Sequence, residues 1–422
     1  MQRTNLDAFH HDAAFCGLRR PPARAAKVIA LPRPRRLLIV LGVLALSLSA
    51  CGRPPDVATS PDEAALESNA KHPTSNDVLG FPAFATKNTT RVAGTDPTSD
   101  AAGIARAVFS GSGTHQHPPV VTLADVHDWR SALAASALVA PPIRAPILFT
   151  DGDSLPDVTK STLAALNPTG SAAAGGAQVI RIGTKAQLGS VKTTDVRASN
   201  PFAMARAIDA FASAVRGTTG ARVLVVSADD PAFALPAAAW AAKSGDTVLF
   251  AHRDSLPADT VAAIKDHSSP HIYVLGPSSV ISPKVTRLLR KLGPVTRTGG
   301  PDPESNSIEF ARYLHGSFGW GIIDPGHGLV FARANTDPAT AAAAAPLSSS
   351  GAYGPLLLLS NATALSKTMA RYLLDIQPGY ANDPVRGVYN RGWLVGDTTA
   401  ITVPLQSEID RYLEIVPVTT KG

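Results

Sequence analysis

Asp151 and Asp153 form the arrangement that most suggests chemistry in this sequence. They flank a glycine and follow a short apolar run at 146–149, where a strand is expected to end. Two carboxylates at this spacing could act as a nucleophile and an acid–base group in a hydrolase. The alternative is a turn, in which Ser154 caps a helix that starts at Pro156.

The same stretch recurs twice, which decides between these interpretations. The copies are 146–156, 248–257 and 356–365, and the matching leucines are Leu155, Leu256 and Leu365. The apolar run and the leucine recur, but the acidic residues are replaced by 252–254, His-Arg-Asp, and by 361–363, Asn-Ala-Thr. Because the residues at these three positions differ between the copies, we interpret the segment as a turn. An envelope hydrolase remains only an alternative.

Other polar clusters give no stronger case for catalysis or metal binding. His115, His117 and His127 lie in loops rich in Gly and Pro and have no acidic partner at a fixed spacing. Asp229 and Asp230 precede a proline, which is typical of a turn. The sequence has no nucleophile elbow, P-loop or zincin motif. We therefore predict a protein that is not an enzyme and that uses no metal or cofactor.

The first fifty residues have the pattern of an export signal. A basic run at 33–36 precedes an apolar core at 37–47, and Leu48-Ser49-Ala50-Cys51 ends it. The tetrad is similar to a bacterial lipobox, in which Cys51 is acylated and holds the protein on the outer face of the membrane. An ordinary secretory signal or an uncut membrane anchor are the alternatives. The long segment before residue 33 also allows a start codon downstream of Met1.

Without this segment, the basic character of the chain disappears. Residues 51–422 contain 31 Lys and Arg and 31 Asp and Glu, so their formal charge is zero. This balance gives no argument for nucleic-acid binding. Cys16 and Cys51 are the only cysteines, so the exported domains have no disulfide and no thiol nucleophile. The polar range 51–85 is expected to be a disordered tether rich in Pro and Ser.

The rest of the chain alternates short apolar runs with segments of helical spacing, which predicts βαβ units and parallel sheets. The expected strands are 120–124, 146–150, 179–183, 223–226, 247–251, 271–276, 328–332, 356–359 and 393–396. The expected helices are 101–109, 131–140, 156–166, 203–215, 234–243, 257–265, 283–292, 339–345, 365–374 and 405–413. Several of these helices are rich in alanine, which would let them pack closely against a sheet or a neighbouring unit.

A second match supports a repeat of about one hundred residues. Residues 297–303 can be laid on 91–97 without a gap, and the match extends to Arg312 on Arg106. The displacement is 206 residues, or twice 103, which is close to the spacings of 101 and 109 residues between the matching leucines. We predict three repeat units, at 86–192, 193–296 and 297–422.

These motifs resemble the type 2 cell-wall-binding repeat family of Gram-positive bacteria. The matching stretches are 91–94, 124–134, 146–150, 155–156 and 272–276. The sequence departs from the family at its Phe-Pro-Asp-Ala-Leu motif, because the first unit reads Trp129-Arg130-Ser131-Ala132-Leu133. The chain is therefore identified as a diverged member.

The resemblance implies three tandem Rossmann-like or flavodoxin-like units of α/β fold, with parallel sheets packed around a pseudo-threefold axis. It also implies a non-catalytic surface protein whose partner is an anionic wall polymer or peptidoglycan. A solute-binding lipoprotein that captures a small molecule between two lobes is the runner-up.

Loops and helix N-termini at one edge of a parallel sheet can meet phosphate or carboxylate groups. The candidates for polymer contact are the residues that open the units: Arg91, Gly94, Arg197, Arg297 and Gly300. In the alternative, each arginine pins its own loop, for example through a nearby aspartate such as Asp96 or Asp302.

Overall fold

The computed structural model describes residues 82–92, 94, 96–110, 116–350 and 354–418. The predicted export signal, Cys51 and most of the predicted tether lie outside these residues. The last part of the range expected for the tether, Pro82–Ala85, forms strand β1. Within the described ranges, no helix combines the length and apolar character needed to cross a membrane.

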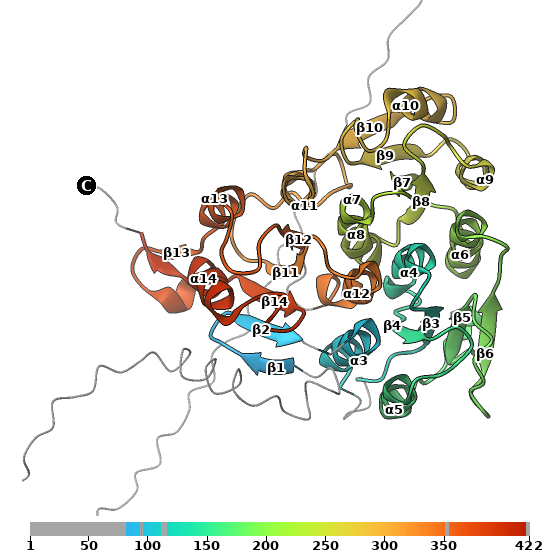
Figure 1. The fold of residues 1–422 in the computed structure, drawn as a ribbon, viewed down its shortest axis with the longest axis horizontal. Helices are drawn as coiled ribbons and strands as arrows, with labels where there is room; N and C mark the ends of the chain where they lie inside the picture. Colours follow the sequence, from blue (N-terminus) through green and yellow to red (C-terminus); the bar gives the residue numbers. More distant parts are fainter. Residues whose placement is uncertain (1–81, 93, 95, 111–115, 351–353, 419–422) are drawn as a thin grey trace, which may run out of the picture. The chain divides into compact units, whose positions relative to one another are not determined.

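Three sheets, each with four parallel strands, form the frame of the fold (Figure 1). In spatial order the first sheet contains β4 (Ile147–Thr150), β3 (Val121–Asp125), β5 (Val179–Ile182) and β6 (Thr193–Val196). The second contains β8 (Thr247–Ala251), β7 (Arg222–Ser227), β9 (His271–Leu275) and β10 (Val295–Thr298). The third contains β12 (Leu356–Leu359), β11 (Gly328–Arg333), β14 (Arg391–Val395) and β2 (Thr89–Val92), with β1 antiparallel at its edge. The predicted α/β fold of tandem Rossmann-like units is confirmed.

The fourth strand of each sheet comes from the segment that opens the following unit. Strands β6 and β10 complete the first and second sheets, and the early strand β2 completes the third, where Thr90 lies opposite Trp393. Sequence analysis did not predict β2, β6 or β10 as strands, because each has only four residues and carries polar side chains. The beginning of the described chain therefore closes onto its end.

The helix after each of these strands begins in the same way. Helices α3 (Pro97–Val108), α6 (Pro201–Arg216) and α11 (Pro303–Arg312) all have proline at the first position. The residue before the proline is Asp96, Asn200 or Asp302, and its side chain accepts hydrogen bonds from backbone N–H groups of the first turn. Proline has no N–H to satisfy there, and the cap pairs donors that the helix leaves unpaired.

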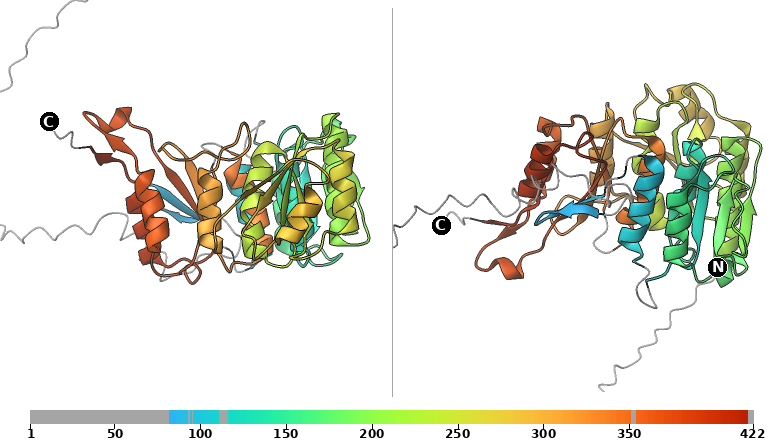
Figure 2. Two further views of the ribbon diagram at one scale, coloured as in Figure 1. Left: turned by 90° about the horizontal axis from the view of Figure 1, so that it is seen from above. Right: turned by 60° about the horizontal axis from the view of Figure 1, so that its bottom comes forward.

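The remaining helices form an outer and a central set. The outer set is α5 (Asp157–Leu166), α9 (Ala258–Asp266), α13 (Lys367–Asp375), α10 (Pro283–Leu289) and α14 (Val403–Leu413). The central set is α4 (Trp129–Ala135) with η1 (Ser136–Val139), α7 (Pro231–Ala234) with α8 (Pro236–Ser244), and α12 (Pro338–Ala343) with η3 (Ala345–Ser348). Short elements η2 (Ala172–Ala174), η4 (Pro384–Arg386), β13 (Gly379–Tyr380) and β15 (Val416–Pro417) complete the fold. Figure 2 shows the strands of the sheets flanked by helices.

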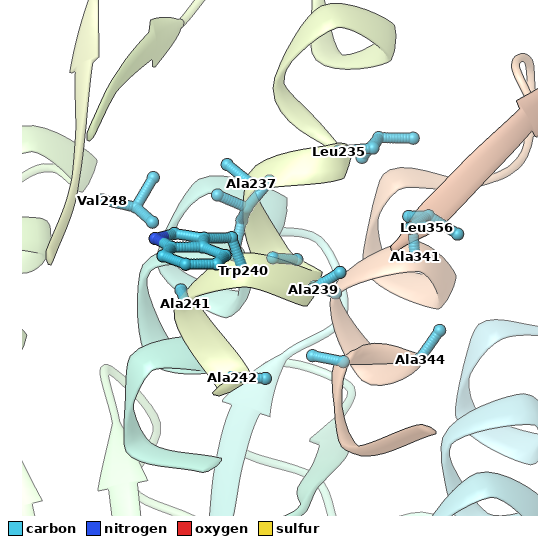
Figure 3. Close-up of a cluster of buried hydrophobic side chains, with 14 of the residues drawn as sticks. Leu235, Ala237, Ala239, Trp240, Ala241, Ala242, Val248, Ala341, Ala344 and Leu356 are labelled. Atoms are coloured by element: carbon cyan, nitrogen blue, oxygen red, sulfur yellow. The ribbon is translucent and has the colours of Figure 1, made fainter. Parts of the chain in front are cut away.

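The central helices join the three units through small side chains. Helix α8 contacts both η1 and η3, and α12 contacts α4. Ala237, Ala241 and Ala341 are fully buried there. Figure 3 shows Ala237 and Ala241 on the helix that carries Trp240, and Ala341 on the facing helix beside Leu356. Small side chains let helices approach closely, so the alanine-rich segments serve as the junction between units, as sequence analysis predicted.

The opening helices add a second, cyclic set of contacts between units. Helix α3 packs on α12, α6 packs on α4, and α11 packs on α7. Each opening helix also packs on an outer helix of its own unit: α3 on α5, α6 on α9 and α11 on α13. The same contacts recur at all three junctions, as the predicted pseudo-threefold packing requires.

Candidate functional site

Arg91, the first candidate for polymer contact, lies inside the protein. It is fully buried, and its guanidinium donates hydrogen bonds to the carbonyl oxygens of Gly396, Asp397 and Ile401 at 2.7–2.8 Å. It also donates to the side-chain oxygen of Gln406 at 2.8 and 3.0 Å. Burial lowers the pKa of Arg91 to about 10, although the nearby Asp397 acts in the opposite direction. Arg91 thus holds the loop that follows β14, so polymer contact by this residue would require that loop to open.

Arg297 occupies the same position in the second sheet and has similar partners. Its guanidinium donates to the carbonyl oxygens of Gly276 at 2.6 Å and Ile281 at 2.7 Å, and to the hydroxyl of Thr286 at 2.8 Å. Burial lowers the pKa of Arg297 as well. The contacts of both arginines match the structural alternative, with carbonyl oxygens as partners in place of Asp96 and Asp302.

Arg197 has a different environment from these two arginines. Its side chain is 53% exposed and forms an ion pair with Asp195 at 2.7 Å. Strand register places Asp195 at the position of Arg91 and Arg297. In this sheet, the arginine stands on the neighbouring strand as Arg181, which donates to the Ala186 carbonyl at 2.9 Å and pairs with Asp195.

Gly94 and Gly300 stand where a strand meets the first turn of a helix. A Cβ atom at Gly94 would lie 2.5 Å from the Cβ of Ser99, and one at Gly300 would lie 2.6 Å from the Cβ of Ser305. Any larger side chain would push the helix away from the strand. The backbone N–H of Gly94 also donates to Asp100 at 2.7 Å. Gly94 thus has a packing role, whereas Gly300 additionally lines a surface groove described below.

The polar residues that first suggested catalysis brace loops against each other. His127 pairs with Asp151 at 2.9 Å, and that hydrogen bond raises the pKa of His127. The equivalent loops of the second unit contain Asp229 and His252, which pair at 2.6 Å with the two residue types exchanged. His115 lies outside the described residues. Among those described, no group of three or more His, Cys, Asp or Glu residues could hold a metal ion.

A surface groove between α11 and α13 has the composition expected of an anion site. It has a volume of about 550 Å³, and its walls are the loop 299–301, one face of α11 and the first turns of α13. Figure 1 shows where these two helices lie. Three cationic side chains line it, those of Arg312, Lys367 and Arg371, against one acid, Glu309. We call it the basic groove.

Two of the cations in the basic groove have no counterion in the described part of the chain. Lys367 and Arg371 are exposed and take part in no ion pair or side-chain hydrogen bond there. Arg312 is held in place, because it pairs with Asp375 at 2.5 Å and lies 5.0 Å from the centroid of the Tyr372 ring. The groove therefore combines one fixed guanidinium with two cations available to a ligand.

The position of these cations is unfavourable for the helix that carries them. Lys367 is the first residue of α13, where the helix dipole opposes a positive charge. Arg371 lies four residues later, on the same face, and so repels Lys367. Each effect costs a few tenths of a kcal/mol. The buried carboxylate of Glu304, which accepts a hydrogen bond from the hydroxyl of Ser366, stands beside this end of the helix and offsets part of these costs. A bound anion would offset the rest.

Comparison with known proteins shows where this fold occurs. No family model matches the sequence. Cwp6 from Clostridium difficile superposes with a TM-score of 0.59 and 18% identity, over 78% of this chain and 48% of that chain. Cwp8 from the same organism superposes with a TM-score of 0.58 and 17% identity, over 78% of this chain and 52% of that chain. The chain shares the fold of these proteins.

A curated relative extends the comparison to sequence. The N-acetylmuramoyl-L-alanine amidase LytC of Bacillus subtilis is 28% identical over 236 residues, which is 55% of this chain and 43% of the relative. The chain thus spans less than half of the length of that relative. Together these matches confirm the predicted resemblance to the type 2 cell-wall-binding repeat family.

Sequence analysis missed the basic groove. It selected residues that open the units, and of these only Gly300 lies in the groove wall. The signal that could have revealed the groove is the pair Lys367 and Arg371, two like charges four residues apart at the start of a helix. Arg312 was noticed only as the repeat of Arg106, and its proximity to α13 depends on tertiary packing.

Proposed function

We propose that this protein binds the bacterial cell wall without catalysing a reaction, and that an anionic wall polymer occupies the basic groove. The cations of Arg312, Lys367 and Arg371 are the observation that carries the proposal. Phosphate or carboxylate groups along a polymer would accept charge-assisted hydrogen bonds from Lys367 and Arg371.

The names of the similar proteins agree with a role at the wall. Cwp6 and Cwp8 share the fold, and LytC is named as an amidase that acts on a muramoyl substrate. Amidase activity is not carried over to this chain, because the match covers less than half of LytC. The involvement of His127, Asp151, Asp229 and His252 in loop bracing supports a binding role over a catalytic one.

The location at the cell surface belongs to the same proposal. Acylation of Cys51 would anchor the protein to the outer face of the membrane, and residues 86–192, 193–296 and 297–422 would form the three repeats beyond the tether. Metabolic labelling with a fatty acid tests the anchor. Incorporation into the wild type that disappears in Cys51→Ser would support it, and labelling that persists in Cys51→Ser would exclude it.

A wall pull-down with a charge reversal tests the basic groove. The full mature chain and its Lys367→Glu/Arg371→Glu variant are mixed with purified cell wall, before and after chemical removal of the anionic polymers. Each lost charge-assisted contact should lower affinity roughly ten-fold, so the variant should lose most of its retention. Wild-type retention should fall to the level of the variant once the polymers are removed.

The matched control is Lys160→Glu/Lys265→Glu. Both lysines are exposed and lie on the outer helices α5 and α9, so this variant carries the same change in net charge away from the groove. It should bind the wall as the wild type does. Equal loss of binding in the two variants would show a general charge effect and contradict the groove.

A further inference from the structure

A cavity lies at the meeting point of the three units. It has a volume of about 450 Å³ and is walled by the ends of α3, η1, α8 and η3. Every unit contributes residues to this wall. A volume in this range is typical of pockets that hold small organic molecules. The cavity is distinct from the basic groove, whose walls come from the third unit alone.

The wall of this cavity divides into an apolar part and a cationic part. Its apolar part is formed by Val108, Phe109, Val139, Pro141 and Pro346. Such a surface favours the hydrocarbon portion of a ligand, because its burial removes apolar area from water. A purely polar ligand, such as inorganic phosphate or a sugar, would leave this part of the wall without a partner.

The cationic part is formed by Lys243 and Arg144. The ammonium nitrogen of Lys243 lies 5.1 Å from the centroid of the Trp240 ring and 4.8 Å from that of Trp320. These two rings hold the ammonium group in place at the cavity. Partial burial lowers the pKa of Lys243, which adds to the advantage of a nearby anion. The hydroxyls of Ser349 and Ser350 stand at the same cavity and could donate to a second oxygen of that anion.

Arg144 contributes a strained backbone as well as a charge. Its φ angle is +56°, in the left-handed region that non-glycine residues rarely adopt. Strain of this kind concentrates at ligand sites, where the surrounding structure maintains it. Its N–H donates to the Ala140 carbonyl at 3.1 Å, which holds the turn that places Arg144 at the cavity.

We propose that this cavity binds a small amphiphilic anion, with its acidic group at Lys243 and Arg144 and its hydrocarbon portion against the apolar wall. A medium-chain carboxylate has both features and a suitable size. The site would give the protein a capacity to capture small molecules in addition to its role at the wall. It resembles the runner-up from the sequence in ligand type, but it lies at a junction of three units and not between two lobes.

Titration calorimetry with octanoate tests this site on the full mature chain. Octanoate should bind with a Kd below about 1 mM, whereas acetate, which lacks the chain, and octanol, which lacks the charge, should bind at least ten-fold more weakly. Lys243→Met keeps the apolar stem and removes the charge, and should weaken octanoate about ten-fold. No heat of binding with octanoate at millimolar concentration would overturn the proposal.

A second variant tests the site independently, in case Lys243→Met does not fold. Arg144→Gly removes the other cation and relieves the left-handed strain, so it should fold at least as well as the wild type while binding octanoate more weakly. The control Lys265→Met removes an exposed lysine of α9 and should leave octanoate binding unchanged. Wild-type affinity in both Lys243→Met and Arg144→Gly would exclude this cavity, and so would equal weakening in Lys265→Met.

Discussion

The helix pair α11 and α13 in the third unit and the helix pair α6 and α9 in the second unit pack in the same way and carry different surface residues. Counted from the first residue of each helix, the places of Arg312, Lys367 and Arg371 are taken in the second unit by Ala210, Ala258 and Ala262. The first unit has Arg106, Asp157 and Ser161 there. The fold therefore does not require cations at these positions, and the proposed anionic ligand would give them a role.

The loop-holding arginines of the three sheets give the opposite result. Each sheet keeps a hydrogen bond from an arginine to a loop carbonyl, although the position of the arginine changes. A loop-holding arginine is Arg91 in one sheet and Arg297 in another, and in the first sheet it moves to the neighbouring strand as Arg181, opposite Asp195. The hydrogen bonds to these loops are thus kept, although the strand that supplies the arginine changes. Exposed positions on the opening and outer helices are under no such constraint, and their residue types differ between the units.

The largest expected effect separates Arg91 from Arg197, which the sequence placed in one group. Arg91→Met would leave the buried carbonyls of Gly396, Asp397 and Ile401 without their donor, and should lower the free energy of unfolding by about 3–5 kcal/mol. Arg197→Met breaks one exposed ion pair and should cost at most about 1 kcal/mol. Urea unfolding of the two variants measures both values. Similar losses would show that the two arginines are equivalent after all.

The next effect concerns one position at the start of the opening helices. It is Asp100 in α3, Met204 in α6 and Asn306 in α11, three residues after the initial proline in each case. Burial raises the pKa of Asp100 to about 6, although hydrogen bonds from Gly94 and Thr340 oppose the shift. Of these three residues, only Asp100 can titrate.

Asp100→Asn should remove this pH dependence. In the wild type the folded state holds the proton more tightly, so its stability is fully present below about pH 4 and falls as the pH rises towards and through 6. Between a pH equal to the ordinary pKa of aspartate and a pH equal to the raised pKa of Asp100, the free energy of unfolding should fall by about 3 kcal/mol. Unfolding free energies of wild type and variant between pH 4 and 7 give the difference. The exposed Asp157→Asn is the control, and a parallel profile for Asp100→Asn would refute the assignment.

Most of the fold could be predicted from the sequence. Apolar runs such as 146–149 and 356–359 indicate buried strands, and the structure has strands there. The short strands β2, β6 and β10 could not be predicted, because their stability comes from pairing with a distant part of the chain. Thr90 lies opposite Trp393, for example, about three hundred residues away. No local pattern can reveal such a partner.

The candidate site was harder to predict from the sequence than the fold, for a related reason. An arginine after a repeat boundary looks the same whether it is buried like Arg91 or exposed like Arg197. Its environment depends on the loop after a strand of another unit, such as 396–401 for Arg91. The basic groove likewise depends on the packing of α11 against α13, which joins residues more than fifty positions apart.

Transfer of the cations to the second unit should produce a smaller change. The variant Ala258→Lys/Ala262→Arg places two cations at the start of α9, at the positions that Lys367 and Arg371 occupy in α13. We expect a gain in wall retention equivalent to about 1 kcal/mol, roughly five-fold, because Ala210 still lacks the fixed guanidinium of Arg312. Retention by walls with and without anionic polymer measures the gain. Unchanged wall retention would show that the shape of the basic groove matters more than its charge.

The smallest effect concerns the stability cost of Lys367. Lys367→Ala places in α13 the residue type that α9 has at the same position, Ala258. Removal of a cation from the first helical residue, and of its repulsion with Arg371, should raise the free energy of unfolding by about 0.5 kcal/mol. The same substitution should weaken retention by the wall. Thermal unfolding at low and high salt checks the first part, because screening should reduce the gain. If Lys367→Ala instead destabilised the protein, the lysine would have a structural partner, and the argument that a ligand accounts for its charge would fail.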